Sequence, residues 1–198
     1  MYNCEYTNNT SYTFNNPLCD NFENINYVGT ADANTLDKAL TCRPVSNKWV
    51  QMFVPRILDI PVQKPSMEGI VTVNTCAEII SQRVIKTPVV TGYTNNAGVL
   101  IPGNEIPNAE CTFLTGRKLI VEGLITQKVI YTSLTENQAL HSASLMIPFS
   151  TFIIVEGDTA LSADFRLYPY VEDVFVYMLS ERTLFSNNTL FIKASAAC

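Results

Sequence analysis

The sequence predicts an all-β fold: an antiparallel β-sandwich, jelly-roll-like, with an extended N-terminal tail and one short helix. From about residue 47 onward, stretches rich in β-branched and aromatic residues alternate with turn residues, and no long helical pattern separates them. Several stretches alternate apolar and polar residues with a period of two, as strands with one buried face do. Of the 198 residues, 47% are hydrophobic and 16% are charged, which leaves ample material for a core.

The first 28 residues are rich in Asn, Thr and Tyr and contain no Lys or Arg. This composition is typical of a disordered tail. Aromatic residues nevertheless fall on alternate positions, as in a strand laid on a sheet, and they give the candidate tail-docking residues Tyr2, Tyr6, Tyr12 and Phe14. Two alternatives stay open: a disordered tail with chance alternation, or a connector that becomes ordered by adding to an exposed sheet edge.

A short helix is expected between residues 30 and 40, with Thr30 or Asp32 as its N-cap. The expected strands then cover residues 49–58, 70–84, 117–132, 143–155, 170–179 and 184–194, with a long loop or weak hairpin at 91–110 and a turn at Ser186-Asn187-Asn188. The expected domain organisation is a connector tail at 1–28, helix and linker at 29–46, the sandwich domain at 47–195, and a cysteine-ended tip at 196–198.

Two of these stretches have faces that can be assigned. In residues 70–84, one face is expected to hold Val71, Val73, Thr75, Ala77 and Ile79. Cys76 then lies on the opposite face, away from the core. Residues 117–132 give the clearest alternation, with Gly123 expected at a bulge or bend. The residues of this second strand expected to point inward are Leu119, Val121, Gly123, Ile125, Val129 and Tyr131.

Several function classes are not expected. The net charge is −5 and no basic run occurs, so a nucleic-acid partner is not expected. The N-terminus has neither a basic start nor an apolar run typical of a secretory signal, and every apolar run is too short to cross a membrane.

No active site is expected either. His141 is the single histidine, and its neighbours Ser142 and Ser144 lie in no nucleophile-elbow motif. No phosphate-binding glycine motif and no zinc-ligand spacing is present. The sequence therefore predicts a protein that is not an enzyme, with no catalytic, cofactor-binding or metal-binding residues and no cofactor.

The hypothesis that copies of the chain are joined by disulfides rests on the positions of the cysteines. Cys4 and Cys198 sit close to the two ends of the sequence, where no core is expected to bury a thiol. Reduced, scattered thiols in a cytosolic protein are the alternative reading. We expect Cys4, Cys19 and Cys198 to form intersubunit disulfides, and their candidate partners are Cys42, Cys76 and Cys111.

A series of segments also carries a family resemblance. In chain order they are Ile57-Leu58-Asp59-Ile60-Pro61, Lys64-Pro65-Ser66-Met67-Glu68, Val84-Ile85-Lys86-Thr87-Pro88, Leu114-Thr115-Gly116-Arg117-Lys118, Gln127-Lys128-Val129-Ile130-Tyr131, Ile147-Pro148-Phe149-Ser150-Thr151 and Tyr170-Val171-Glu172-Asp173-Val174. By these segments the stretch from about Trp49 to Ala194 resembles the SPOCS domain family of spore-forming Firmicutes, especially its clostridial members. The resemblance implies a role in spore coat or cortex morphogenesis and no catalytic residues. Some members carry a LysM module, and no LysM-like segment follows Ala194 here.

Residues and resemblance together predict a structural subunit that self-assembles into a disulfide-cross-linked fibre or layer on the endospore surface. The expected partner is the protein itself, in a head-to-tail homopolymer, with other spore coat proteins as further partners and neither nucleic acid nor membrane. The chain is expected to be made in the mother-cell cytoplasm and oxidised after lysis. The alternative is a coat-morphogenesis adaptor that binds another coat protein.

Overall fold

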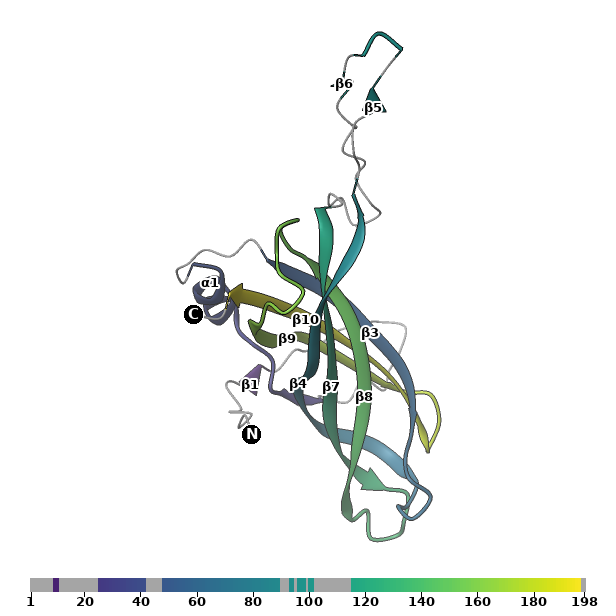
Figure 1. Ribbon diagram of the computed structural model, residues 1–198. Helices are drawn as coiled ribbons and strands as arrows, with labels where there is room; N and C mark the ends of the chain where they lie inside the picture. Colours follow the sequence, from purple (N-terminus) through teal and green to yellow (C-terminus); the bar gives the residue numbers. More distant parts are fainter. Residues whose placement is uncertain are drawn as a thin grey trace.

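The computed structural model of the protein describes residues 9–10, 25–41, 48–89, 93–94, 96–98, 100–101 and 115–196 (Figure 1). Their long strands form two β-sheets packed face to face, with a single helix among the described residues, α1 (Ala33–Thr41), at one side. The predicted β-sandwich is therefore confirmed. Asp32 is the helix N-cap, because the backbone N–H of Thr35 donates to its Oδ1 at 2.7 Å.

The larger sheet, sheet A, has the strand order β1-β2-β4-β7-β8. Its three long strands β4, β7 and β8 form an antiparallel meander, whereas β2 runs parallel to β4. The bounds of its strands are β1 Asn9–Thr10, β2 Asn26–Val28, β4 Met67–Val89, β7 Thr115–Ser133 and β8 Leu140–Ile154.

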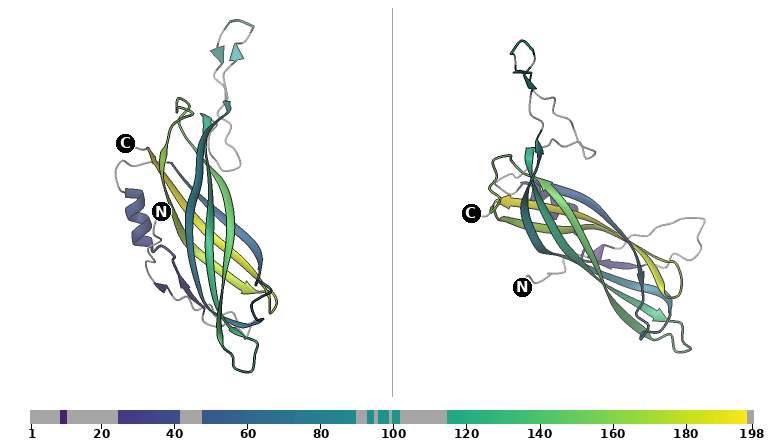
Figure 2. Two further views of the ribbon diagram at one scale, coloured as in Figure 1. Left: turned by 60° about the horizontal axis from the view of Figure 1, so that its bottom comes forward. Right: turned by 45° about the vertical axis from the view of Figure 1, so that its right-hand side comes forward.

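The smaller sheet, sheet B, has the order β3-β10-β9 and is antiparallel throughout. Its strands are β3 Trp49–Asp59, β10 Thr183–Ala196 and β9 Phe165–Met178. The chain crosses between the sheets from β3 to β4 and again from β8 to β9. The short strands β5 (Tyr93–Thr94) and β6 (Leu100–Ile101) pair with each other inside the expected hairpin region and lie beyond one end of the sandwich (Figure 2).

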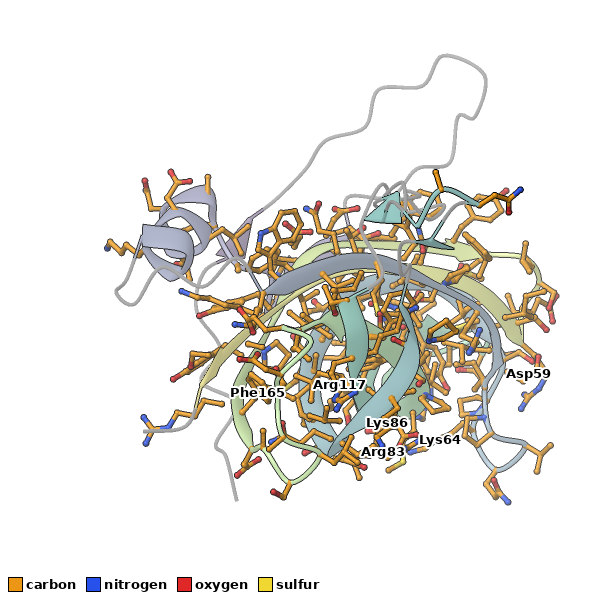
Figure 3. All side chains as sticks on the ribbon, turned by 45° about the horizontal axis from the view of Figure 1, so that its top comes forward. Asp59, Lys64, Arg83, Lys86, Arg117 and Phe165 are labelled. Carbon is orange, nitrogen blue, oxygen red and sulfur yellow. The ribbon has the colours of Figure 1, made fainter. Side chains whose placement is uncertain are left out.

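The core lies between the sheets, and in Figure 3 side chains crowd this space. Strand β7 crosses its middle, and the predicted alternation of β7 is confirmed. Gly123 is buried too, because an added Cβ would overlap the ring of Phe149 on β8 and the carbonyl oxygen of Glu78 on β4. The expected irregularity lies opposite Gly123, as a shift of register between Ile79 and Ser81. The other five predicted inward residues of β7 are fully buried: Leu119, Val121, Ile125, Val129 and Tyr131.

Strand β4 departs from its predicted pattern at one residue. Val73 and Thr75 are buried as expected, but Val71 is exposed and Ile70 is buried instead. A shift of register between Ile70 and Thr72 causes the difference, because an extra residue reverses which side chains face the core. The assignment of Val71 to the core face was wrong for this reason.

The turn predicted at Ser186-Asn187-Asn188 was also wrong, because β10 runs through all three residues. Ser186 and Asn188 are fully buried between the sheets. The Asn188 Nδ2 donates to Ser186 Oγ at 3.1 Å, and its Oδ1 accepts from Gln127 Nε2 at 3.2 Å. Gln127 Nε2 also lies 3.4 Å from Thr75 Oγ1, so a polar cluster joins sheet A to sheet B inside the core.

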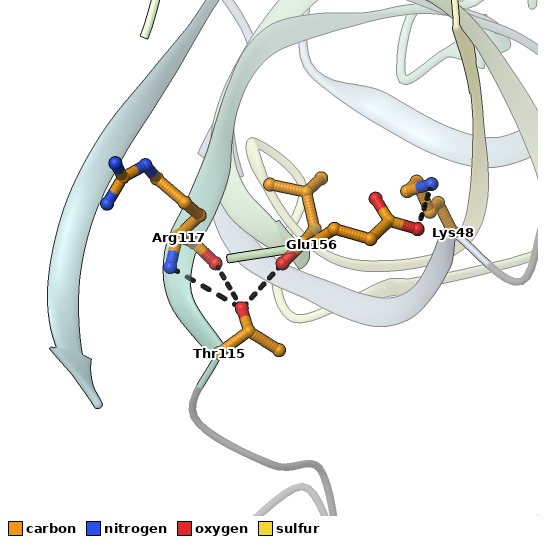
Figure 4. Close-up of polar contacts among 5 residues, drawn as sticks. Lys48, Thr115, Arg117 and Glu156 are labelled. Atoms are coloured by element: carbon orange, nitrogen blue, oxygen red, sulfur yellow. Dashed lines mark hydrogen bonds and ion pairs between the residues drawn. The ribbon is translucent and has the colours of Figure 1, made fainter. Parts of the chain in front are cut away.

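The end of the sandwich nearest β5 and β6 is held by polar contacts (Figure 4). The Thr115 hydroxyl, at the start of β7, donates to the carbonyl of Val155, just after β8, at 2.5 Å. An ion pair of 2.6 Å joins Lys48, just before β3, to Glu156, and this bond holds the pKa of Glu156 below its usual value. The hydrogen bond joins β7 to β8 within sheet A, and the ion pair joins the start of β3 in sheet B to the end of β8.

Candidate functional site

Most residues predicted to mediate assembly lie outside the described residues. These are the tail-docking candidates Tyr2, Tyr6, Tyr12 and Phe14 and the cysteines Cys4, Cys19, Cys42, Cys111 and Cys198. Their assignment stays a prediction.

Cys76 is the one cysteine that the described residues include. It lies half-buried on β4 between Thr75 and Ala77, which contact the core, so it belongs to the outward face of sheet A. Its sulfur is disulfide-bonded. Cys76 could therefore bond to a neighbouring subunit only by exchanging this bond.

Residues 25–31, which we call the clasp, join the N-terminal segment to the sandwich. Strand β2 within the clasp adds to the edge of β4, with Asn26 opposite Thr72 and Val28 opposite Asn74. Strand β1 in turn pairs antiparallel with β2. The N-terminal segment thus adds strands to a sheet edge, which is the binding mode of an added β-strand.

The clasp also contacts the other sheet, through two hydrogen bonds to β9. The backbone N–H of Ala31 donates to the carbonyl of Val171 at 2.7 Å, and the backbone N–H of Val176 donates to the Tyr27 hydroxyl oxygen at 3.3 Å. Burial raises the pKa of Tyr27; the hydrogen bond from Val176 opposes this shift and the charge of Asp173 adds to it. The clasp therefore spans from β4 to β9 and closes that side of the sandwich.

The packing of the clasp is close along its length. Ile25 and Tyr27 pack against the hydrophobic core, and Thr30 is 4% exposed. Gly29 has a φ of +101°, and an added Cβ would overlap the carbonyl oxygen of Thr75. Glycine is required at this position both for the backbone conformation and for the approach to β4.

The sequence reasoning missed the clasp, because it assigned residues 1–28 as a whole to the tail. A local signal was present in Ile25-Asn26-Tyr27-Val28-Gly29, where two apolar residues alternate with Asn26 and a glycine follows. Ile25 and Tyr27 are the two that face the core.

The opposite side of the sandwich is formed by β3 and β8, which are edge strands among the described residues. Each carries a proline near its middle, Pro55 in β3 and Pro148 in β8. Proline donates no ladder hydrogen bond and discourages a further strand from pairing. The edges of β3 and β8 therefore discourage strand addition, whereas the edge of β4 accepts a strand, as its pairing with β2 shows.

The described part of the chain offers little for other kinds of site. His141 is half-buried, with its ring 6.1 Å from that of Tyr131. Within the described ranges no three His, Cys, Asp or Glu side chains gather as a metal site would require. None of the helices in those ranges has the length and apolarity needed to cross a membrane.

Comparison with known proteins gives one match. The family model described as SipL, SPOCS domain, matches residues 66–179, which is 114 of the 198 residues and includes β4 to β9. No curated protein and no solved structure matches the chain. Since the match covers more than half of the chain, this protein belongs to the SPOCS domain family and is a spore-associated protein.

Proposed function

We propose that the protein is a structural subunit that self-assembles into a disulfide-cross-linked fibre or layer on the endospore surface, with its N-terminal segment as the connector. The observation that carries the proposal is the clasp. It adds a strand to one sheet and bonds to the other, so it has the contacts of a connector that holds a sandwich closed.

In an isolated chain the clasp occupies its own sandwich. A second copy has the same clasp and the same partners for it on β4 and β9, so the same residues would make the same contacts between molecules. Such an exchange is head-to-tail, and a head-to-tail contact continues into a filament unless it closes into a ring. The residues between the clasp and β3 number 17 (32–48), and with α1 kept helical they reach roughly 40 Å. This length allows the clasp to leave its own sandwich for an adjacent one.

Disulfides then lock the joint. Each bond would add on the order of 2–4 kcal/mol by analogy with bridges inside a chain. More importantly, a cross-linked joint resists dilution and separates only when reduced. Cys4, Cys19 and Cys198 remain the proposed intersubunit cysteines, with Cys42, Cys76 and Cys111 as candidate partners.

The exchange can be tested by trapping the clasp. Asn26 and Thr72 are opposite each other in the β2–β4 ladder, so Asn26→Cys/Thr72→Cys introduces a pair that can form a disulfide. Light and heavy isotope-labelled protein would be mixed in equal amounts under reducing conditions, assembled, and then oxidised. Mass spectrometry identifies peptides that join residues 26 and 72. Peptides with one light and one heavy member are expected, because they arise only when the clasp of one molecule lies on β4 of another.

The matched control is Asn26→Cys/Ser144→Cys, since Ser144 lies on β8, two strands away from β4 in sheet A, and should form no cross-link. Assembly itself is followed by electron microscopy and by reducing and non-reducing gels. Ordered assemblies whose cross-linked peptides all share one isotope would overturn the connector mechanism but not self-assembly. Isolated single chains under oxidising conditions would overturn the polymer function, and a stable complex with a different coat protein would then favour the adaptor.

A further inference from the structure

The outward face of sheet B, on the side away from the core, is dominated by aromatic residues. The pairing of β3, β10 and β9 places the side chains of this face in rows that cross the three strands. These rows include Gln51–Phe191–Tyr170, Phe53–Thr189–Asp173 and Ile57–Phe185–Tyr177. Three aromatic pairs cross between strands: Trp49 with Phe191 at 5.5 Å between ring centroids, Tyr170 with Phe191 at 6.2 Å and Phe175 with Phe185 at 6.3 Å. The exposed apolar members, which we call the aromatic face, are Trp49, Phe53, Ile57, Tyr168, Phe175 and Tyr177.

The exposed apolar surface of the aromatic face is comparable to the largest apolar patch on a typical monomer. Phe53 is 70% and Ile57 67% exposed, and the other four members are between 40% and 46% exposed. With side-chain areas of about 150–250 Å² for aromatic residues, the exposed apolar surface is on the order of 500 Å². The largest such patch on a typical monomer is about 300–600 Å², and a standard interface buries about 800 Å² on each partner. The aromatic face can therefore supply most of one side of a stable interface.

The charged groups in the rows of this face include Asp173, exposed on β9 opposite Thr189, and Lys193, buried on β10 between Trp49 and Tyr168. Asp59 ends β3, and Glu172 accepts two hydrogen bonds of 2.8 Å from Gln51. The outward face of sheet A differs. It has exposed apolar residues too, Ile80 at 66% and Met146 at 68%, but an ion pair between Arg83 and Glu122 and exposed charges at Glu78 and Lys128 lie among them. A partner poor in charge thus fits sheet B and not sheet A.

We infer that the aromatic face binds the aromatic face of a second copy, sheet against sheet, in an isologous contact. A two-fold axis places the same patch on both sides of the contact, so apolar surface meets apolar surface on each. Twisted sheets stack in this way about 10 Å apart with strands at about −30°. The inference rests on the proposed function, because the partner is another subunit, but it uses a different surface from the clasp. The clasp extends a filament, and the aromatic face joins two filaments side by side.

The test is a pair of charge substitutions with a matched control. Phe53→Glu/Ile57→Glu places two carboxylates in the aromatic face, and Ile80→Glu/Met146→Glu places two on the outward face of sheet A at residues of similar exposure. Self-association of the full chain is measured by sedimentation velocity under reducing conditions. The first variant is expected to associate at least about tenfold more weakly than wild type, and the control is expected to associate like wild type.

A second variant, Tyr177→Lys on the edge strand β9, should also weaken association. Thermal unfolding of each variant reports whether the fold is retained. Cross-linking of residues 26 and 72 between light and heavy chains should persist in the face variants while electron micrographs change from paired to single filaments. The inference is overturned if wild type does not associate under these conditions, if the face variants associate normally, or if the control loses association equally. Loss of the mixed-isotope peptides in wild type would count against the connector mechanism, not against the aromatic face.

Discussion

Gly29 shows how one missing side chain allows the clasp to reach the sandwich. Its φ of +101° lies in the left-handed region, and the carbonyl oxygen of Thr75 occupies the space of a Cβ. Any other residue would have to move the backbone of β4 or of the clasp.

We therefore predict that Gly29→Ala lowers the free energy of unfolding by about 2–4 kcal/mol, because backbone strain and steric overlap add. Gly98→Ala is the matched control, since Gly98 also has a positive φ of +75° but nothing lies within 4 Å of its Cβ position. The control should cost about 1–2 kcal/mol. Urea unfolding measures both variants, and equal costs would show that the approach to Thr75 is not tight.

The polar cluster in the core shows where reasoning from single residues failed. Ser186, Asn187 and Asn188 in succession are typical of a turn, because their side chains bond to nearby backbone. In the sandwich Ser186 and Asn188 instead find partners within the core, and Gln127 faces them from β7. The Oε1 of Gln127 is buried without a partner. Only the packing of two sheets distant in sequence supplies this environment, so no local pattern could reveal it.

At the scale of elements, the long strands were predictable and the short ones were not. Apolar and polar residues alternate along β7 because one face of the strand contacts the core. The two-residue period of its sequence therefore agrees with the burial of its side chains. Strand β4 contains register shifts, and these depend on its pairing with β7 rather than on its own sequence. The clasp buries few residues, and its signal was masked by a long polar segment. The predicted cysteine and tail residues cannot be judged in the same way, because apart from Cys76 they lie outside the described residues.

The link between β2 and β9 gives a pH prediction. Burial raises the pKa of Tyr27 above its usual value of 10.0. A raised pKa in the folded state means that the unfolded state releases this proton more readily, so stability is constant below the usual pKa and falls as pH rises above it. Tyr27→Phe should flatten this alkaline decline while lowering stability at neutral pH by about 1–3 kcal/mol, since the N–H of Val176 loses its partner.

Urea unfolding at a series of pH values from neutral to alkaline measures both effects. An unchanged alkaline slope in Tyr27→Phe would mean that Tyr27 ionises as easily in the folded chain as in the unfolded one. Tyr131, whose pKa is also raised by burial, stays in place in both proteins and leaves a residual slope.

At the scale of the whole molecule, the sandwich is closed by a segment that precedes the long strands of both sheets in sequence. A chain that begins at residue 25 keeps Ile25, Tyr27 and Thr30 against the sandwich, whereas one that begins at residue 32 loses all three.

We predict that the chain starting at residue 25 unfolds with a free energy close to that of the full protein, and that the chain starting at residue 32 is less stable by about 3 kcal/mol or more. The stability is lowered because Ile25 and Tyr27 no longer pack against the core and because the hydrogen bonds to β9 are lost. A synthetic peptide covering the clasp should restore part of the loss when added in excess, which thermal unfolding would detect. Equal stability of the two chains would show that the sandwich does not need the clasp.

The parallel direction of β2 along β4 has a consequence for any array joined through it. If each molecule pairs its β2 with β4 of the next molecule in this direction, every junction has the same orientation. The array therefore has two different ends. One terminus would present an unpaired edge of β4 and the other an unused N-terminal strand. Growth could then be started or capped at one terminus alone, for example by a chain that has the groove but no clasp.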